Sequence, residues 1–323
     1  MKRWINRFFI LIIPLIGLCH AALAQTYPNK PVRFIAPFVP GGGTDITART
    51  IAKRLSEVWG QQVVVDNRTG AAGAIGVELT ANAPPDGYTI CLISASHTVN
   101  SATNPKLPYD LTRDLQGISQ ATSLFYTIVV HPSIPANSIK ELIAHAKAQP
   151  GKLNFGSSGT GGLQHFAGEM LAYLGGIKLT HVPYKGGAAA LAALMTGEIQ
   201  VGFATLLTVR PHAAAGRVRV LAVSAAKRAP AAPDLPTVAE AGVPGYEVDQ
   251  WYGVITSAKV PPAIIKKLSE AIIAAVQRPE LAQRLGADGS TPIGSTPAQF
   301  NAHIKSEIAK WRKLVQAAGL QLH

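Results

Sequence analysis

The sequence predicts an α/β protein of two lobes, each a mostly parallel sheet flanked by helices. Two glycine-rich turns, at residues 37–45 and 156–162, each follow a strand pattern and precede a helical one. After each turn, strand and helix patterns keep alternating, which is typical of βαβ units. Two short apolar segments, near 125–130 and 247–253, carry the chain from one series to the other and back. Two such crossings indicate a two-segment hinge between the lobes.

The two turns indicate binding. A glycine-rich turn between a strand and a helix points backbone N–H groups, and the positive end of the helix dipole, at whatever lies outside the strand end. Glycine also lets the backbone approach a ligand closely. Short polar side chains add hydrogen-bonding groups: Thr44, Asp45, Ser157, Ser158 and Thr160. We therefore expect one ligand clasped between the lobes.

Residues 1–24 have the pattern of a secretory signal peptide. Three cations among the first seven residues precede the apolar run 8–18, and Ala22-Leu23-Ala24 supplies the small-x-small pattern of a cleavage site. The run is too short to span a bilayer. We expect cleavage before Gln25 and export of a soluble protein to the periplasm.

The two cysteines agree with this interpretation. Cys19 would leave with the signal peptide, and Leu18 before it departs from the Gly, Ala or Ser of lipidation patterns. Cys91 would remain alone, which excludes an intramolecular disulfide. Its position in the strand-like run 88–93 predicts a buried, inert thiol.

The first series of elements begins with a strand ending near residue 35. A helix follows from Asp45 to Trp59, with Thr44 or Asp45 as its N-cap and Gly60 at its end. The next elements are a strand at 63–65, a turn at 67–76, a helix at 77–83 and a strand at 89–93. The carboxyl ends of parallel strands share one edge of a sheet. The polar residues after the last strand are therefore expected beside the first turn: Ser94, Ser96, His97 and Asn100.

The second series fills the middle of the chain. Its predicted elements are a strand at 125–130, a helix from Ser138 to Ala148, strands at 152–155, 178–182, 200–203 and 218–223, a helix after the second turn and a helix at 188–195. A strand at 251–256 runs back, and helices at 262–277, 279–285 and 296–318 complete the chain. We therefore assign residues 25–127 and 250–323 to lobe 1 and residues 128–249 to lobe 2.

Sequence patterns of catalysis and of nucleotide binding are missing from both turns. Neither turn spells G-x-G-x-x-G, no G-x-x-x-x-G-K-[ST] loop occurs, and residues 156–160 fail the G-x-S-x-G elbow at its last position. No two histidines stand within four residues of each other, which argues against a metal site. Lys and Arg outnumber Asp and Glu by 30 to 18, but no basic block with interleaved aromatics indicates nucleic-acid binding. We expect no cofactor, no metal and no nucleic acid.

Several side chains leave alternatives open. His165 lies within two helical turns of Ser158, which would suit a Ser–His hydrolase, although a histidine on a helix face is more often simply solvated. Asp45 suits either a helix N-cap or acceptance of a ligand hydroxyl or amine. Phe38 and Tyr184 suit either cleft walls or packing beside the turns. Since no convincing catalyst emerges, we expect the protein not to be an enzyme.

A series of longer motifs runs in order through the chain. They are YPxKPV at 27–32, PGGGTDxxxR at 40–49, VDNRxGAxG at 65–73, PDGYT at 85–89, LPYD at 107–110, VPYKG at 182–186 and LPTxAExG at 235–242. In these motifs the chain resembles the solute-binding family of tripartite tricarboxylate transporters, the TctC- or Bug-type periplasmic receptors.

The resemblance implies a Venus-flytrap, type II-like fold whose lobes close on a small carboxylate-bearing solute and present it to a membrane permease. It also implies that backbone amides and hydroxyls of the two turns, aided by water, hold the carboxylate with few or no salt bridges. Carried over, the lobe 1 contacts are Phe38, Gly41, Gly42, Thr44 and Asp45, joined by Ser94 and Asn100. The lobe 2 contacts are Ser157, Ser158, Gly159, Thr160 and Gly161.

Two departures from the family pattern bear on the ligand. Gly162 stands where many relatives close the second turn with serine, and Ala204 followed by Thr205 stands where relatives often carry Asp. Losing an acceptor at Ala204 argues against an amino-bearing ligand and makes the pocket less polar. We hypothesise a solute with a less polar body, such as an aromatic or simple aliphatic carboxylate.

Three functions remain in competition at this stage. The favoured one is a monomeric receptor that delivers an organic anion to a permease. A sensory receptor would use the same fold and hand its closed form to a signalling partner. An exported hydrolase would use Ser157 or Ser158 as its nucleophile, and turnover of generic esters would reveal it.

Overall fold

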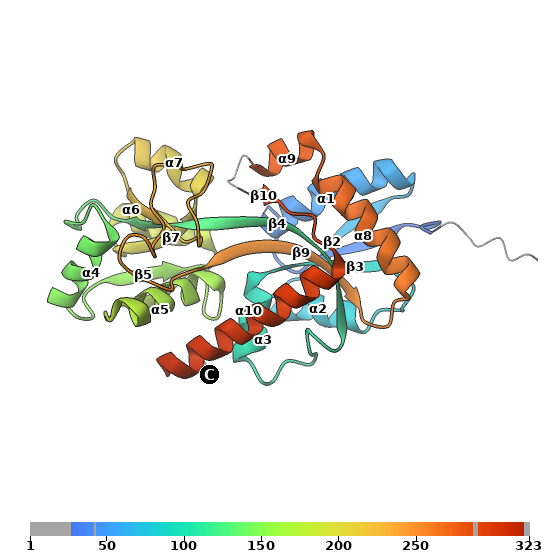
Figure 1. The fold of residues 1–323 in the computed structure, drawn as a ribbon, viewed down its shortest axis with the longest axis horizontal. Coiled ribbons are helices and arrows are strands. Elements are labelled where there is room, and N and C mark those ends of the chain that lie inside the picture. Colours follow the sequence, from blue (N-terminus) through green and yellow to red (C-terminus); the bar gives the residue numbers. More distant parts are fainter. Residues whose placement is uncertain (1–26, 42, 287–289, 320–323) are drawn as a thin grey trace, which may run out of the picture.

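The computed structural model describes residues 27–41, 43–286 and 290–319. The predicted signal peptide and Gly42 therefore lie outside the described residues. Figure 1 shows two bodies side by side, joined by the long strands β4 (Leu115–Val130) and β9 (Asp249–Ser257). The predicted α/β fold of two lobes is confirmed. Lobe 1 is the body around β1 to β3, and lobe 2 is the body around β5 to β8.

Lobe 1 is a mixed sheet with helices on both faces. Strand β1 pairs in parallel with β2 and β3, and β3 pairs antiparallel with β9, which in turn pairs with β4. The strands are β1 (Val32–Ala36), β2 (Val63–Asn67), β3 (Thr89–Ser94) and the short β10 (Thr291–Pro292). The helical elements are α1 (Gly43–Trp59), η1 (Ala71–Gly73), α2 (Ala74–Ala81), α3 (Ala95–Thr103), α8 (Pro262–Val276), α9 (Pro279–Gly286) and α10 (Pro297–Ala318).

The nearly continuous apolar sequence of β1 follows from this layering. Phe34 belongs to the core beneath α1 and α8, whereas the next residue, Ile35, belongs to the core beneath α2 and α3. Successive side chains of a strand point to opposite faces, so a strand covered on both faces needs apolar residues throughout. Helix α1 supplies its side of this core through Ala48, Ile51 and Leu55, which share one helix face.

Lobe 2 repeats the arrangement with its own parallel strands. β5 pairs in parallel with β6 and β7, while β4 pairs antiparallel with β7 and β8. The strands are β5 (Asn154–Ser157), β6 (Thr180–Pro183), β7 (Val201–Thr205) and β8 (Arg219–Val223), and the helices are α4 (Ile139–Ala148), α5 (Leu163–Gly175), α6 (Gly187–Thr196) and α7 (Leu206–Ala214). As predicted, Ser138 caps α4 by accepting a hydrogen bond from the Glu141 N–H.

Three elements connect the lobes. Residues 115–125 of β4 pair with β9, and residues 126–130 pair with β7 and β8. Where the partner changes, the Ser224 hydroxyl accepts from the Tyr126 N–H at 2.9 Å and donates to the Val248 carbonyl. Helix α10, assigned from sequence to lobe 1, also reaches lobe 2, because Trp311 packs edge-on against Phe166 of α5 at 5.8 Å. Figure 1 shows α10 running obliquely past both bodies.

Two helices, the short strand β10 and most of one longer strand are missing from the sequence prediction. Helix α3 reads ASHTVNSAT, whose Ser, Thr and Asn compete with the backbone for hydrogen bonds and are poor helix formers. Helix α7 contains Pro211, which normally argues against a helix interior. Strand β4 begins ten residues before the predicted start at 125, because polar residues such as Ser119 and Thr122 are buried where β4 pairs with β9.

Candidate functional site

A cavity of about 570 Å³ lies between the lobes. Lobe 1 lines it with Phe38, Val39, Gly43, Thr44, Ser94 and Ser96, and the connecting strands line it with Tyr126, Gln250 and Tyr252. Lobe 2 contributes Ser158, Gln164, Gly187, Ala188, Leu191, Met195, Ala204, Thr205, Thr208 and His212. We call this cavity the cleft. Parts of both glycine turns line the cleft, which is the arrangement that the sequence predicts for a ligand clasped between the lobes.

Five helices begin at the cleft. α1, α3, α5, α6 and α7 each contribute a residue from the N-cap or first turn to its lining. Each helix start carries unpaired N–H groups and a partial positive charge. Among the described residues that line the cleft there is no Lys, Arg, Asp or Glu. Hydroxyls, amides and helix dipoles therefore dominate its polar character, and this environment favours an anion.

The first turn is fixed by an ionic network centred on Asp45. The Asp45 carboxylate accepts from the Gly41 N–H at 3.0 Å, from Arg49 Nε at 3.0 Å and from Asn67 Nδ2 at 2.9 Å. Asn67 Nδ2 also donates to the Phe38 carbonyl at 3.0 Å. The network therefore holds both sides of the turn.

Asp45 itself does not line the cleft, and its side chain is only 5% exposed. Burial on its own would raise its pKa, but the hydrogen bonds from Arg49, Gly41 and Asn67 and the Arg49 charge together lower it. The predicted N-cap role is wrong, because α1 begins at Gly43 and places Thr44 and Asp45 inside its first turn. A carboxylate in that turn is still favoured by the helix dipole.

The floor of the cleft approaches the first turn closely. A Cβ atom on Gly43 would lie 2.3 Å from the Tyr252 hydroxyl oxygen, so a side chain there would require Tyr252 to move. Behind this contact, Phe38 packs edge-on against His97 at 5.5 Å, and the Ser94 N–H donates to His97 Nδ1 at 3.0 Å. His97 is fully buried, and burial lowers its pKa to about 4. It is therefore a neutral anchor for the start of α3.

The second turn is fixed by Ser157 and two histidines. The Ser157 hydroxyl contacts His181 Nε2 at 2.7 Å and accepts from the Gly159 N–H at 3.1 Å. The Gly161 N–H donates to His165 Nδ1 at 3.2 Å. The expectation that His165 is solvated is wrong, because the residue is 5% exposed and its ring stacks on His181.

The lobes also touch at the cleft, where the Leu163 N–H of α5 donates to the Ser96 hydroxyl of α3 at 3.4 Å. The sequence places Ser96 beside the first turn but does not predict it as a ligand contact. The crossing strands supply further unselected residues, Gln250 and Tyr252. The hinge pattern was a signal for them, since strands that cross between lobes must form the floor of the space between them.

The predicted contacts divide into two groups. Those that line the cleft are Phe38, Thr44, Ser94, Ser158, Ala204 and Thr205. Those placed behind or beside it are Gly41, Asp45, Asn100, Ser157, Gly159, Thr160, Gly161 and Tyr184. Ser157 is fully buried, and the Tyr184 hydroxyl donates to Glu198 Oε1 at 2.8 Å. Gly42 lies outside the described residues.

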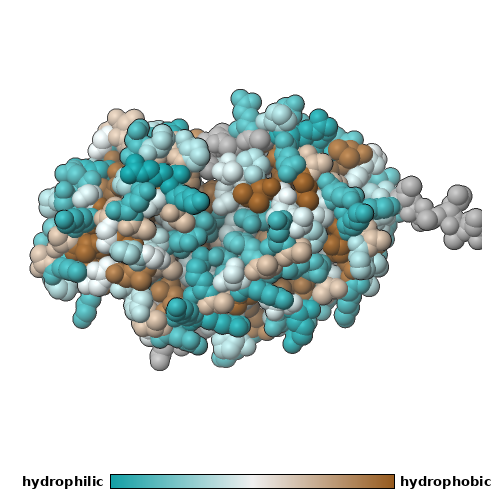
Figure 2. Space-filling view, viewed as in Figure 1, coloured by the Kyte–Doolittle hydropathy of each residue, from teal (hydrophilic) through white to brown (hydrophobic). Residues whose placement is uncertain are grey.

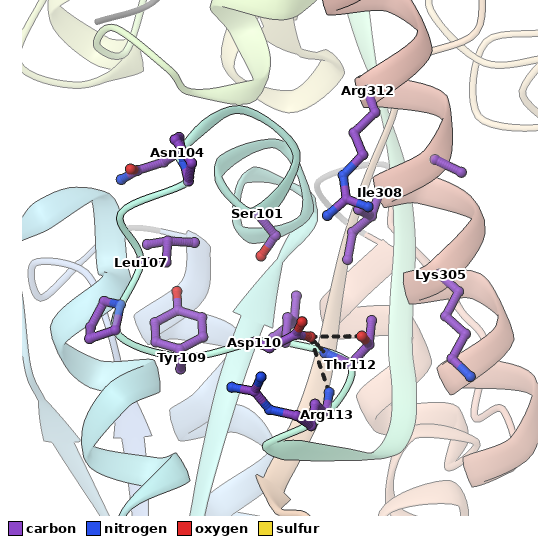
Figure 3. A pocket seen from close by; sticks show the side chains of 14 residues that line it. Ser101, Asn104, Leu107, Tyr109, Asp110, Thr112, Arg113, Lys305, Ile308 and Arg312 are labelled. Carbon is purple, nitrogen blue, oxygen red and sulfur yellow. Dashed lines mark hydrogen bonds between the residues drawn. The ribbon is translucent and has the colours of Figure 1, made fainter.

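A second cavity, of about 620 Å³, lies between the end of α3, the segment 104–113 and α10 (Figure 3). Asp110 lines this cavity, and its Oδ1 accepts a hydrogen bond from the Thr112 hydroxyl at 2.7 Å. Lys305 and Arg312 line it from α10. None of the predicted contact residues lines it. The cleft is therefore the candidate site.

Other candidate chemistry is sparse in the part of the chain that the structure describes. No group of three His, Cys, Asp or Glu residues there could hold a metal ion. The Cys91 thiol is fully buried as predicted, and burial raises its pKa to about 12. No helix among the described residues is long and apolar enough to cross a membrane.

Comparison with known proteins identifies relatives along nearly the whole chain. A family model described as the tripartite tricarboxylate transporter family receptor matches residues 47–320. Protein BugT of Bordetella pertussis is 34% identical over 314 residues, which cover 97% of this chain and 96% of BugT. Among solved structures, R. palustris Rpa4515 with adipate is 35% identical with a TM-score of 0.83, covering 91% of this chain and 99% of its own. The periplasmic binding protein BugD is 31% identical with a TM-score of 0.80, covering 91% and 99%.

Proposed function

The chain belongs to the tripartite tricarboxylate transporter receptor family, and on that premise we propose that its cleft captures a small carboxylate-bearing organic anion for a membrane permease. The family consists of solute-binding receptors rather than enzymes. The carboxylate would be held by helix starts and hydroxyls, without a salt bridge to Lys or Arg.

One observation carries this proposal. Five helices begin at a cavity whose described lining has no Lys, Arg, Asp or Glu. Buried anions need compensation, and here the helix dipoles and hydroxyls such as those of Thr44, Ser158 and Thr205 supply it. A cationic or zwitterionic solute would find no carboxylate to pair its ammonium group.

The lobe 2 wall supports a solute with a less polar body. Leu191, Met195 and Ala204 line it with apolar side chains. Rpa4515, the relative solved with adipate, accommodates a flexible aliphatic dicarboxylate. We therefore favour aliphatic or aromatic carboxylates over amino acids and citrate.

We also propose that affinity includes closure of the lobes about the crossing strands, with lobe 1 at 25–127 and 250–323 and lobe 2 at 128–249. The change of β4 partner between Phe125 and Tyr126 supports this boundary, as does Ser224, which ties both crossings. Closure would aim donors of both lobes at one solute and exclude water from it.

The direct test is native mass spectrometry of the mature protein, followed by a thermal-shift screen of adipate, shorter and longer dicarboxylates, aromatic acids, amino acids and citrate. A ligand at about 100 times its Kd adds about 2.7 kcal/mol to stability, so binding would be visible. Stabilisation by amino acids and citrate alone would overturn the ligand class, and stabilisation by no acid would overturn the receptor function.

The protein's location and partners follow from the same proposal. We expect a periplasmic monomer that meets either the family's permease or, as the alternative, a sensor protein. On the face that Figure 2 shows, hydrophilic residues cover most of the surface and hydrophobic ones form small separate groups, so this face presents no large apolar patch to a partner. The hydrolase alternative has one supporting contact, between Ser157 and His181, but Ser157 is fully buried. A test ester should therefore not be turned over.

A further inference from the structure

A pair of histidines lies behind the second turn. His165 on α5 and His181 on β6 stack with their ring centroids 3.8 Å apart and their planes 17° from parallel. Phe155 of β5 lies against both rings, with centroids 6.2 Å from His165 and 5.0 Å from His181. Neither histidine lines the cleft, so neither touches the proposed solute.

Each imidazole is bonded to a different part of the turn. His181 Nε2 contacts the Ser157 hydroxyl at 2.7 Å, and that hydroxyl accepts from the Gly159 N–H at 3.1 Å. His165 Nδ1 accepts from the Gly161 N–H at 3.2 Å. Gly159 and Gly161 adopt φ values of +139° and +78°, which side-chain-bearing residues avoid. The rings therefore fix a backbone that glycine alone would leave free.

We propose that His165 and His181 are positioning residues for solute binding: they hold the turn 157–161 so that Ser158 and the start of α5 face the cleft. The inference rests on the proposed function and deepens it, because it names the groups that prepare the lobe 2 half of the site. A pre-formed turn lowers the entropy that binding must remove.

The contact with Gly161 requires that His165 Nδ1 carry no proton. His165 Nδ1 accepts a hydrogen bond, so a proton there would face the Gly161 N–H. The Glu169 carboxylate lies 3.5 Å from His165 Nε2 and faces the other edge of that ring. Burial, and then the neighbouring His165, lower the pKa of His181 to about 4, while Glu169 opposes the shift. His181 is therefore neutral at neutral pH.

The test uses matched substitutions in the full mature protein. His165→Phe and His181→Phe keep a ring in the stack but remove its nitrogen atoms. His165→Asn places an acceptor near Nδ1, and His181→Gln places a polar atom near Nε2. His145→Phe, on α4 away from the turn, is the control.

The first readout needs no ligand: amide hydrogen exchange of Gly159 and Gly161 by NMR. We expect exchange of Gly161 in His165→Phe, and of Gly159 in His181→Phe, to be faster by about 5- to 30-fold, the equivalent of one or two hydrogen bonds. His165→Asn and His181→Gln should restore most of the protection. Equal exchange in the Phe and the Asn or Gln variants would overturn the inference, because packing alone would then explain the stack.

The second readout is the Kd for adipate by titration calorimetry. We expect the Phe variants to weaken binding by about 5- to 30-fold and the Asn and Gln variants by less than about threefold. Unchanged Kd in the Phe variants, with wild-type binding intact, would overturn the inference but not the receptor function. Absence of wild-type binding to any carboxylate would instead overturn the receptor function, while the exchange experiment still decides whether the histidines position the turn.

Discussion

The turn after β1 is held by an ionic network, whereas the turn after β5 is held by two stacked histidine rings. Asp45 joins Gly41, Arg49 and Asn67 in the first. His165 and His181 bind the backbone and a serine hydroxyl in the second. Both glycine-rich turns are therefore held by residues outside the cleft, but the chemistry of those contacts differs between the two turns. In both turns the ionisable group stands outside the cleft lining.

Removing the ionic centre should have the largest effect. Asp45→Ala leaves the Gly41 N–H, Asn67 and Arg49 without their shared acceptor, so the free energy of unfolding should fall by about 2–3 kcal/mol. Urea denaturation measures this, and adipate binding should weaken in parallel.

The matched control is Glu270→Ala, which breaks an exposed pair with Lys266 and should cost less than about 1 kcal/mol. Equal losses in the two variants would show that Asp45 does not organise the first turn.

A charge placed in the lobe 2 wall should have the next largest effect. Ala204→Asp puts a carboxylate into the cleft, where like charges repel an anionic solute by about 2 kcal/mol, or about 30-fold in Kd. Calorimetry with adipate measures the loss, and Ala204→Asn separates charge from size. If both variants bind alike, the cleft does not discriminate by charge at this position.

The pH dependence of stability should separate the two turns. The pKa of His181 is lowered to about 4, so the unfolded chain takes up a proton first, and stability should fall as pH drops from about 6.5 toward 4. His181→Gln should reduce this loss by about 1 kcal/mol or less, since the ring is partly exposed. The pKa of Asp45 is also lowered, so its contribution to stability is lost as pH falls through the ordinary carboxylate range and below it, at lower pH than that of His181.

Unfolding curves at pH 7, 6, 5 and 4 of the wild type, His181→Gln and Asp45→Ala check this order. His97 also has a pKa near 4 and contributes equally to all three proteins, so only the differences are interpreted. If stability falls as steeply between pH 6.5 and 5 in His181→Gln as in the wild type, ionisation of His181 does not contribute to this pH dependence.

Placing a serine at position 162 should have the smallest effect. Gly162 is the N-cap of α5 with extended backbone, and a Cβ there would meet the Gly159 carbonyl at 3.4 Å and the Ser158 hydroxyl at 3.5 Å, which are ordinary contacts. Gly162→Ser should therefore raise stability by a few tenths of a kcal/mol, about 0.3. A shift in solute preference toward more polar acids, measured in the same thermal-shift panel, would sharpen the ligand class further.

Much of the fold could be predicted from residue patterns because local signals agreed with it. The apolar run of β1, the amphipathic face of α1 and the cap of α4 at Ser138 each encode an element through nearest neighbours. Helices α3 and α7 could not be predicted, since polar residues and Pro211 oppose them locally and only their packing between sheet and cleft holds them. Residues such as Tyr252 line the cleft because the crossing strands form its floor, an arrangement that arises only in the folded chain.

The sequence by itself determined two glycine turns, a strand and helix order that gives two lobes, and a family whose members bind solutes. These features can be predicted from the sequence because glycine spacing and apolar periodicity involve residues only a few positions apart. Only the tertiary structure decided that Asp45 stands behind its turn and that His165 and His181, far apart in the chain, stack to support the other. Hydrogen bonds and burial between distant segments depend on how the chain folds back on itself, and no local pattern records that.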